Sequence, residues 1–382
     1  MLRFVPIITI AFMIGPVSAG LIGTLLPAFG ILPALGGTEP GLDPWAALFA
    51  QPGIWHSVRL SLVNGLIASF VSVAIVMLFC AAWQGTRIFR AMQRILSPIL
   101  AVPHATAAFG LAFLIAPSGW IARVIAQFAG WDRPPDIAII HDPLGIAMIA
   151  GLVAKEIPFL FLMTLAALPQ ADTDRTAQIT ATLGYGRVAG WFKATLPRIY
   201  PQIRLPVLAV LAYSTSVVDV AIILGPTTPA PLAVRILGWL SDPDLALRFM
   251  ASSAAILQLL VVVVAIGIWV AGERIIALVG RQIAASGKRF RHDGGMRAGS
   301  AVLAGLSAGA LILGLVVLLV WSIAGFWGFP DIMPRSFSLR LWQREYDAIG
   351  SSLVTTLLIA VPTVVIAIAL VLGCLEHETK SR

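Results

Sequence analysis

Long stretches with few or no charged residues restrict how this chain can fold more than any other feature. A helix needs about 20 apolar residues to cross a hydrocarbon core of about 30 Å. The sequence offers eight such stretches, near residues 4–29, 60–83, 96–117, 143–168, 205–225, 249–272, 299–326 and 349–375. Composition agrees, because 59% of the residues are hydrophobic and 12% charged, against about 45–50% and 25% in soluble domains. The sequence predicts an all-α, polytopic membrane bundle of about eight transmembrane helices.

Several classes of protein are disfavoured by what the sequence contains. Cys80 and Cys374 both lie inside apolar runs, so we expect neither a metal site nor a redox pair, and no cofactor. The net charge of +8 comes from residues at the ends of apolar runs, which is typical of a membrane protein and argues against nucleic-acid binding. The sequence contains no phosphate-binding loop of the Gly-x4-Gly-Lys-Ser/Thr type, so we expect no ATP hydrolysis by the chain itself and no enzyme.

The distribution of lysine and arginine predicts the orientation in the membrane. If the N-terminus is cytoplasmic, the cytoplasmic segments hold 17 of these residues and the outer segments hold 8. Cytoplasmic loops are enriched in Lys and Arg, so both termini and the loop 169–204 are predicted to be cytoplasmic. The first span is longer than the apolar core of a signal peptide, and we expect a retained helix.

The chain carries an internal repeat with an offset of about 291 residues. The second span begins Ser61-Leu62-Val63, and the same three residues recur at Ser352-Leu353-Val354 after another span and outer loop. We therefore expect a first domain at 1–280, a cytoplasmic linker at 281–298 and a partial second domain at 299–382. The second copy has only two spans, so it is either a two-helix remnant or part of a chain of about 580 residues, and we favour the latter. Its two spans are expected to pack loosely or to dock against the first copy.

The loop 169–204 carries the most informative pattern in the sequence. A short helix is expected at 174–183, ending at Gly184, followed by a second helix at 188–196 that ends before Pro197. The loop resembles the coupling segment of ABC transporter permeases, the binding-protein-dependent transport inner-membrane component family. In that family's motif, Glu-Ala-Ala is followed by three residues, a glycine, nine residues and Ile-x-Leu-Pro. Gly184 and the pair Leu196-Pro197 match the motif, whereas Gln178 stands at the position of the family's glutamate.

Other segments extend the resemblance over nearly the whole chain. Ser97 to His104 and Lys155 to Leu160 resemble fused two-half permeases of the iron(III)/thiamine group, and Ser216 to Pro226 resembles a thiamine-type (Ynj-like) subgroup. The resemblance implies a permease subunit of a binding-protein-dependent importer in a bacterial inner membrane. Its implied partners are a cytoplasmic ABC ATPase dimer and a periplasmic solute-binding protein, and its implied substrate is thiamine-like or another small solute. It also implies that Gln178, Gly184, Tyr185, Leu196 and Pro197 face or shape the contact with the ATPase.

Three formal charges lie inside the expected spans: Lys155, Glu156 and Asp219. A charge facing lipid at the bilayer centre costs about 2.5 kcal/mol or more, so we expect one of the first two to pair with Asp219 across the bundle. These residues and His104 either line the transport path or only fix the packing of the helices. An internal repeat with buried charges also suits an ion-coupled secondary transporter, which is the alternative function.

Overall fold

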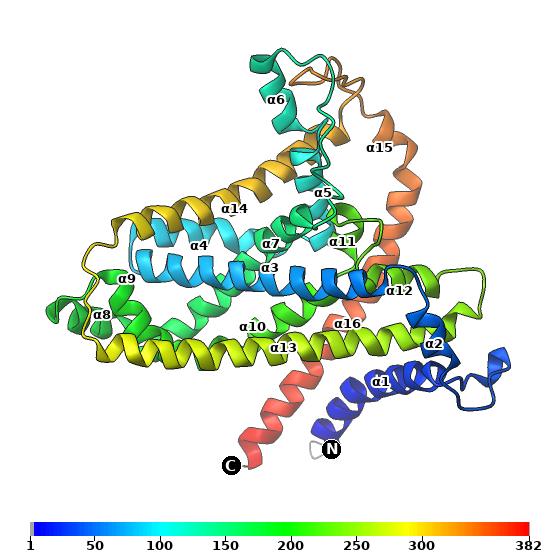
Figure 1. Ribbon diagram of the computed structural model, residues 1–382, viewed down its shortest axis with the longest axis horizontal. Coiled ribbons are helices and arrows are strands. Elements are labelled where there is room, and N and C mark those ends of the chain that lie inside the picture. The colour runs from blue at the N-terminus through cyan, green and yellow to red at the C-terminus, as the bar shows by residue number, and fades with distance from the viewer. Residues whose placement is uncertain (1–3, 382) are drawn as a thin grey trace.

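A computed structural model describes residues 4–381, with side chains up to residue 379 (Figure 1). Every regular element in this range is helical, apart from two isolated β-bridges in loops. The elements up to the coupling loop are α1 (Val5–Ala28), η2 (Pro33–Leu35), α2 (Asp43–Phe49), α3 (Ile54–Trp83), α4 (Arg87–Ile99), α5 (His104–Ile115), α6 (Trp120–Ala129) and α7 (Ile146–Ala167). They are followed by η3 (Leu168–Ala171), α8 (Thr173–Thr182), α9 (Arg187–Gly190), η4 (Trp191–Thr195), α10 (Leu196–Ser216), α11 (Asp219–Leu224), α12 (Leu232–Leu240), α13 (Leu247–Ala285), α14 (Gly294–Ser322), α15 (Arg340–Arg344) and α16 (Tyr346–Ser381).

The prediction of a polytopic helical membrane bundle is confirmed. Seven helical segments of the described residues are long and apolar enough to cross a membrane. Two of the expected spans are interrupted. The run 96–117 is divided by a break at residues 100–103. The third segment that is long and apolar enough to cross the membrane is formed instead by α5 and α6 together. The run 205–225 is divided between α10 and α11, because the backbone leaves the helical conformation at Val217.

The centre of the bundle is built on α3, which packs against α7 and α10. Its buried face carries small residues at helical spacing, among them Ser57, Ser61, Gly65 and Ser69. Small side chains let helices in a membrane approach closely, where van der Waals packing replaces the hydrophobic effect. A Cβ added at Gly65 would lie only 2.7–2.8 Å from the backbone of Thr215 on α10. The close approach of these helices therefore depends on glycine at this position.

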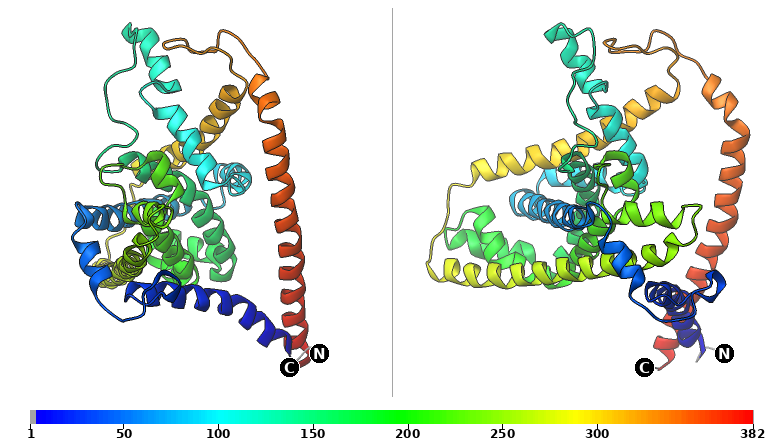
Figure 2. Two further views of the ribbon diagram at one scale, coloured as in Figure 1. Left: turned by 90° about the vertical axis from the view of Figure 1, so that its right-hand side faces the viewer. Right: turned by 45° about the vertical axis from the view of Figure 1, so that its right-hand side comes forward.

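The last two long helices, α14 and α16, which we expected to form a partial second domain, differ in their packing. Helix α14 docks against α5, where the backbones of Gly110 and Gly314 touch: a Cβ added at either would come within 2.9 Å of the other's carbonyl carbon. Helix α16 runs along one side of the molecule (Figure 2) and is exposed over most of its length. It packs against α1 near the start of that helix, where Gly373 approaches Val5.

The loop between α14 and α15 is fixed to α6 through Arg123. This side chain is buried, and its guanidinium donates to the carbonyls of Gly328 at 2.7 Å and Asp331 at 2.9 Å. The guanidinium also lies 5.0 Å from the ring centroid of Trp327, close enough for a cation–π interaction. The segment after α13 therefore contacts the preceding helices at this end of the bundle as well as along α14.

Candidate functional site

The predicted coupling segment, residues 169–204, contains helix α8, whose ends follow local sequence rules. Asp174 lies in the first turn, where the helix dipole favours an acidic side chain. Gly184 has a φ of +77°, and the amide of Tyr185 donates to the carbonyl of Thr180 at 3.0 Å. This left-handed residue after the helix is the common glycine stop. The expected helix at 174–183 therefore agrees with the structure within about one residue at each end.

The second part of the segment differs from the sequence prediction. Helix α9, the π turn η4 and helix α10 follow one another without a break, so the chain does not leave the helix before Pro197. Pro197 therefore lies inside this continuous helical stretch, one residue after α10 begins. In a regular α-helix the ring of Pro197 would clash with the carbonyl of Lys193. The π turn η4, which is wider than an α-helical turn, contains Lys193.

The outer surface of α8 carries exposed apolar residues. Ile179 is 52% exposed and Leu183 is 53% exposed, and Gln178 is exposed beside them. The ring of Tyr185 is half-buried under the ammonium of Lys193, which lies 4.8 Å from the ring centroid. Leu196 packs against the core, whereas Pro197 is exposed. Among the motif residues, Gln178 is therefore free to meet a partner and Leu196 anchors the segment.

Gln84, just after α3, ties the coupling segment to the bundle. Its side-chain oxygen accepts a hydrogen bond from the indole of Trp191 at 2.9 Å, and its amide nitrogen donates to the hydroxyl of Thr173. Its main-chain carbonyl accepts a hydrogen bond from Arg187. Burial lowers the pKa of the Arg187 guanidinium, as does the neighbouring Arg297, but an arginine remains charged in proteins. In Figure 1, α8 and α9 lie at one end of the bundle, beside the end of α13 and the start of α14.

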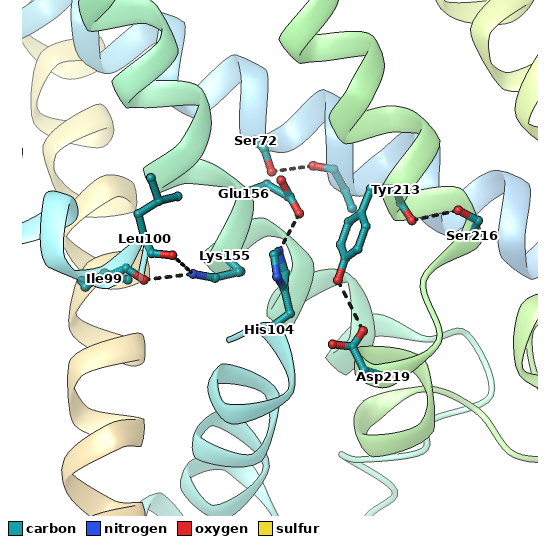
Figure 3. Close-up of polar contacts among 10 residues, drawn as sticks. Ser72, Ile99, Leu100, His104, Lys155, Glu156, Tyr213, Ser216 and Asp219 are labelled. Carbon is teal, nitrogen blue, oxygen red and sulfur yellow. Dashed lines mark hydrogen bonds and ion pairs between the residues drawn. The ribbon is translucent and has the colours of Figure 1, made fainter. Parts of the chain in front are cut away.

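Of the charges expected inside the membrane, Lys155 lies at the break between α4 and α5 (Figure 3). Lys155 on α7 is 2% exposed, and its ammonium donates to the carbonyls of Ile99 at 2.9 Å and Leu100 at 3.1 Å. The last carbonyls of a helix have no partner within it. A buried cation and unpaired carbonyls thus satisfy each other at a point where water is scarce.

The neighbouring residue Glu156 points to a different set of polar groups. Its carboxylate lies 3.3 Å from Nε2 of His104, the first residue of α5. The imidazole of His104 packs on the ring of Tyr213, with centroids 4.7 Å apart. The hydroxyl of Tyr213 donates to the carboxylate of Asp219 at 3.3 Å. A continuous polar cluster therefore runs from α7 through α5 and α10 to the start of α11.

The expected ion pair between Asp219 and a residue of α7 is wrong. Among the described residues, Asp219 forms no salt bridge, and its hydrogen bond from Tyr213 replaces the expected partner. The physical reason is that main-chain carbonyls hold Lys155 and an imidazole holds Glu156. The His104 side chain is 34% exposed, and Tyr213 and Asp219 are partly exposed, so the cluster is accessible from one side.

The polar cluster coincides with two interruptions of the helices. It lies where two helices are broken, at residues 100–103 and at Val217, and irregular backbone at membrane depth persists only inside protein or beside a wet cavity. The described residues contain no group of three or more His, Cys, Asp or Glu side chains that could hold a metal ion.

Comparison with known proteins identifies the relationship. No family model matches the chain. Over 260 residues, the chain is 32% identical to the inner membrane ABC transporter permease protein YnjC of Escherichia coli (strain K12). The chain is a homologue of an ABC transporter permease. The aligned region covers 68% of this chain and 48% of that permease, so the chain spans about half the length of its relative. The resemblance inferred from the coupling motif is thereby confirmed.

Several residues that contact the coupling segment or belong to the polar cluster could not be identified from the sequence. Gln84, Tyr213 and Asp293 are ordinary polar residues in sequence, and only the fold brings them to the coupling segment or the polar cluster. A weak signal existed for Gly186, since Gly-Tyr-Gly places two glycines in one turn.

Proposed function

We propose that the chain is a transmembrane permease subunit of a binding-protein-dependent ABC importer in a bacterial inner membrane. In this role it forms part of the substrate path and is driven by a separate ATPase dimer, which hydrolyses the ATP. A periplasmic solute-binding protein delivers the substrate. The substrate class that follows from the resemblance is a thiamine-like or another small solute. The homology to an ABC transporter permease favours this function over an ion-coupled secondary transporter.

The observation that carries the proposal is the exposed helix α8 on a rigidly held turn. Its apolar residues Ile179 and Leu183 face outward, although a helix of this length usually buries its apolar side chains. The hydrogen bond from Gln84 to Thr173 and the left-handed Gly184 fix the direction in which α8 projects. An apolar surface on a rigid projection suits docking into a complementary groove of a partner.

The polar cluster supports the same function. His104, Tyr213 and Asp219 offer hydrogen-bonding groups at two helix breaks within an apolar bundle. Such groups can replace water around a polar solute while it crosses. We propose that this cluster lines the substrate path. Lys155 holds the break between α4 and α5 in place.

The experiment is co-purification of the permease with a candidate ABC ATPase partner. Leu183→Asp places a charge on the apolar surface of α8, and we expect ATPase retention to fall about tenfold or more while the amount of permease in the membrane stays unchanged. Ser241→Asp is the matched control, because it adds the same charge to an exposed residue after α12, at the other end of the bundle. Normal ATPase retention by Leu183→Asp, or uptake that collapses with the proton gradient and ignores ATP, would contradict the proposal.

A further inference from the structure

The linker between α13 and α14, residues 286–293, lies directly on the coupling segment. The amide of Gly186 donates to the carbonyl of Arg289 at 3.0 Å, and Arg291 donates to the carbonyl of Gly184 at 3.3 Å. On the other side of the linker, the ammonium of Lys193 donates to the carbonyl of Lys288 at 2.8 Å. These contacts join two segments that are about 100 residues apart in sequence.

Gly186 shows that the linker packs closely against the coupling segment. Its φ of −61° and ψ of 152° are open to any residue, so the backbone does not require glycine here. A Cβ at this position would lie 2.1 Å from the carbonyl oxygen of Phe290, and the next nearest atoms also belong to the linker. The linker is therefore the reason that this position excludes a side chain.

Asp293 fastens the end of the linker. Its side chain is buried, and one carboxylate oxygen accepts a hydrogen bond from the amide of Val188 at 2.9 Å, at the start of α9. Asp293 is also the N-cap residue of α14, yet its side chain caps no amide of that helix. An aspartate at an N-cap usually bonds its own helix. Here the carboxylate is turned to α9, so one residue joins the start of α14 to the coupling segment.

The start of α14 is further tied to α3. The indole of Trp83 donates to the carbonyl of Arg297 at 3.1 Å and to the hydroxyl of Ser300 at 3.2 Å. Farther along, α14 touches α5 backbone to backbone at Gly314 and Gly110. A displacement of the coupling segment would thus reach α14 through short, buried contacts. Helices transmit such displacements because packed interfaces are not continuously deformable.

We propose that the linker 286–293 acts as part of the coupling segment. Asp293 is the positioning residue that makes the Gly184–Val188 turn and the start of α14 move together. The proposal rests on the proposed function, because it assigns the linker a role in coupling. It means that ATPase-driven movement of the first copy is passed directly to the first helix of the second copy.

Trypsin cleavage of the complete permease in detergent tests whether the linker is docked on the coupling segment. The experiment needs no ATPase and does not depend on the orientation of the chain in the membrane. The linker offers exposed cleavage residues at Lys288, Arg289 and Arg291. Cleavage requires local release of the backbone. We expect slow cleavage in the wild-type chain and cleavage about tenfold faster in Asp293→Ala, which loses a charge-assisted hydrogen bond.

Three further variants sharpen this test. Gly186→Ala should also speed cleavage, since its methyl group displaces only the linker, and it keeps the test decisive if Asp293→Ala does not fold. Asp293→Asn should stay near the wild-type rate, because an amide oxygen can still accept the hydrogen bond. His292→Ala, in the same linker and exposed, should change nothing. Fast cleavage of the wild-type chain, or unchanged rates in both Asp293→Ala and Gly186→Ala, would overturn the docking.

Transport in proteoliposomes with the ATPase and binding protein tests the coupling role. We expect Gly186→Ala to retain the ATPase but to lower the solute moved per ATP hydrolysed by about threefold or more. A linker that only stabilises the fold would leave this ratio unchanged, and that result would refute the coupling role. If the wild-type chain retained no ATPase, the proposed function would fail together with the coupling role, and the trypsin result would still decide the docking.

Discussion

Replacing Lys155 tests how the break between α4 and α5 is held inside the bundle. Lys155→Met keeps the length of the side chain but removes the ammonium that donates to Ile99 and Leu100. Each buried carbonyl left without a donor costs about 1–3 kcal/mol, or about 2–6 kcal/mol for the pair. Removing the desolvation cost of a buried cation offsets part of this. We expect a net loss of about 2–4 kcal/mol.

The contrast with Asp219 makes the expectation specific. In Asp219→Asn the amide oxygen can still accept the hydrogen bond from Tyr213, so the loss should stay under about 1 kcal/mol. Because Lys155 and Asp219 share no contact among the described residues, the double variant should be additive within about 0.5 kcal/mol. An ion pair between the two would give a large coupling energy instead.

The chain contains its own reporter for this measurement. Cys80 is fully buried, so a thiol-reactive fluorescent dye labels it only on unfolding, once Cys374 has been replaced by serine. At about 2 °C per kcal/mol, the apparent Tm should fall by about 4–8 °C in Lys155→Met and by about 2 °C or less in Asp219→Asn. An unchanged Tm in Lys155→Met, or recovery of Asp219→Asn by the second substitution, would refute the reasoning.

The remaining predictions concern the coupling turn, the contact between the two copies and the topology. Gly184→Val forces a branched residue into a left-handed conformation at a strain of about 1–3 kcal/mol, so ATPase retention should fall while membrane levels persist; normal retention would argue against the role of this turn. Gly314→Leu should sharply lower the amount of folded protein, whereas Gly309→Leu on the same helix, with open space around it, should be tolerated; equal effects would mean that the close approach to α5 is unimportant. Tyr185→Cys in a chain without other cysteines should react with a membrane-impermeant reagent only from the cytoplasmic side, and labelling of intact cells would reverse the predicted topology.

The sequence predicts the long helices well because the bilayer imposes one simple requirement on them. In hydrocarbon every backbone group must be bonded within the segment, so a long apolar run must be helical. Helices α1, α3, α14 and α16 accordingly begin and end within a few residues of the expected spans, although α3 begins earlier, at Ile54. The breaks were harder to place. Pro98 lies inside α4, whereas the chain leaves the helix at residues 100–103, where Lys155 supplies the missing partner for the carbonyls.

The partners of the buried charges could not be read from the sequence for a related reason. A sequence displays formal charges, so the only visible partner for Lys155 was another charge such as Asp219. Main-chain carbonyls are present at every residue and become partners only where a helix ends. The same holds for Asp293, whose position before α14 suggests an ordinary helix cap, although the fold directs its carboxylate to α9. Long-range polar contacts therefore depend on helix ends that tertiary packing determines.

The coupling segment and the polar cluster are connected through α7 and through α10. Helix α7 carries Lys155 and Glu156 and passes through η3 towards α8. Helix α10 begins at the π turn of the coupling segment and carries Tyr213 just before the break at Val217. The two helices that flank α8 and α9 thus supply Glu156 and Tyr213, two members of the polar cluster. Under the proposed function, an ATPase that tilts α8 would move both walls of the cluster at once, and the breaks at residues 100–103 and at Val217 are where the backbone could absorb the change.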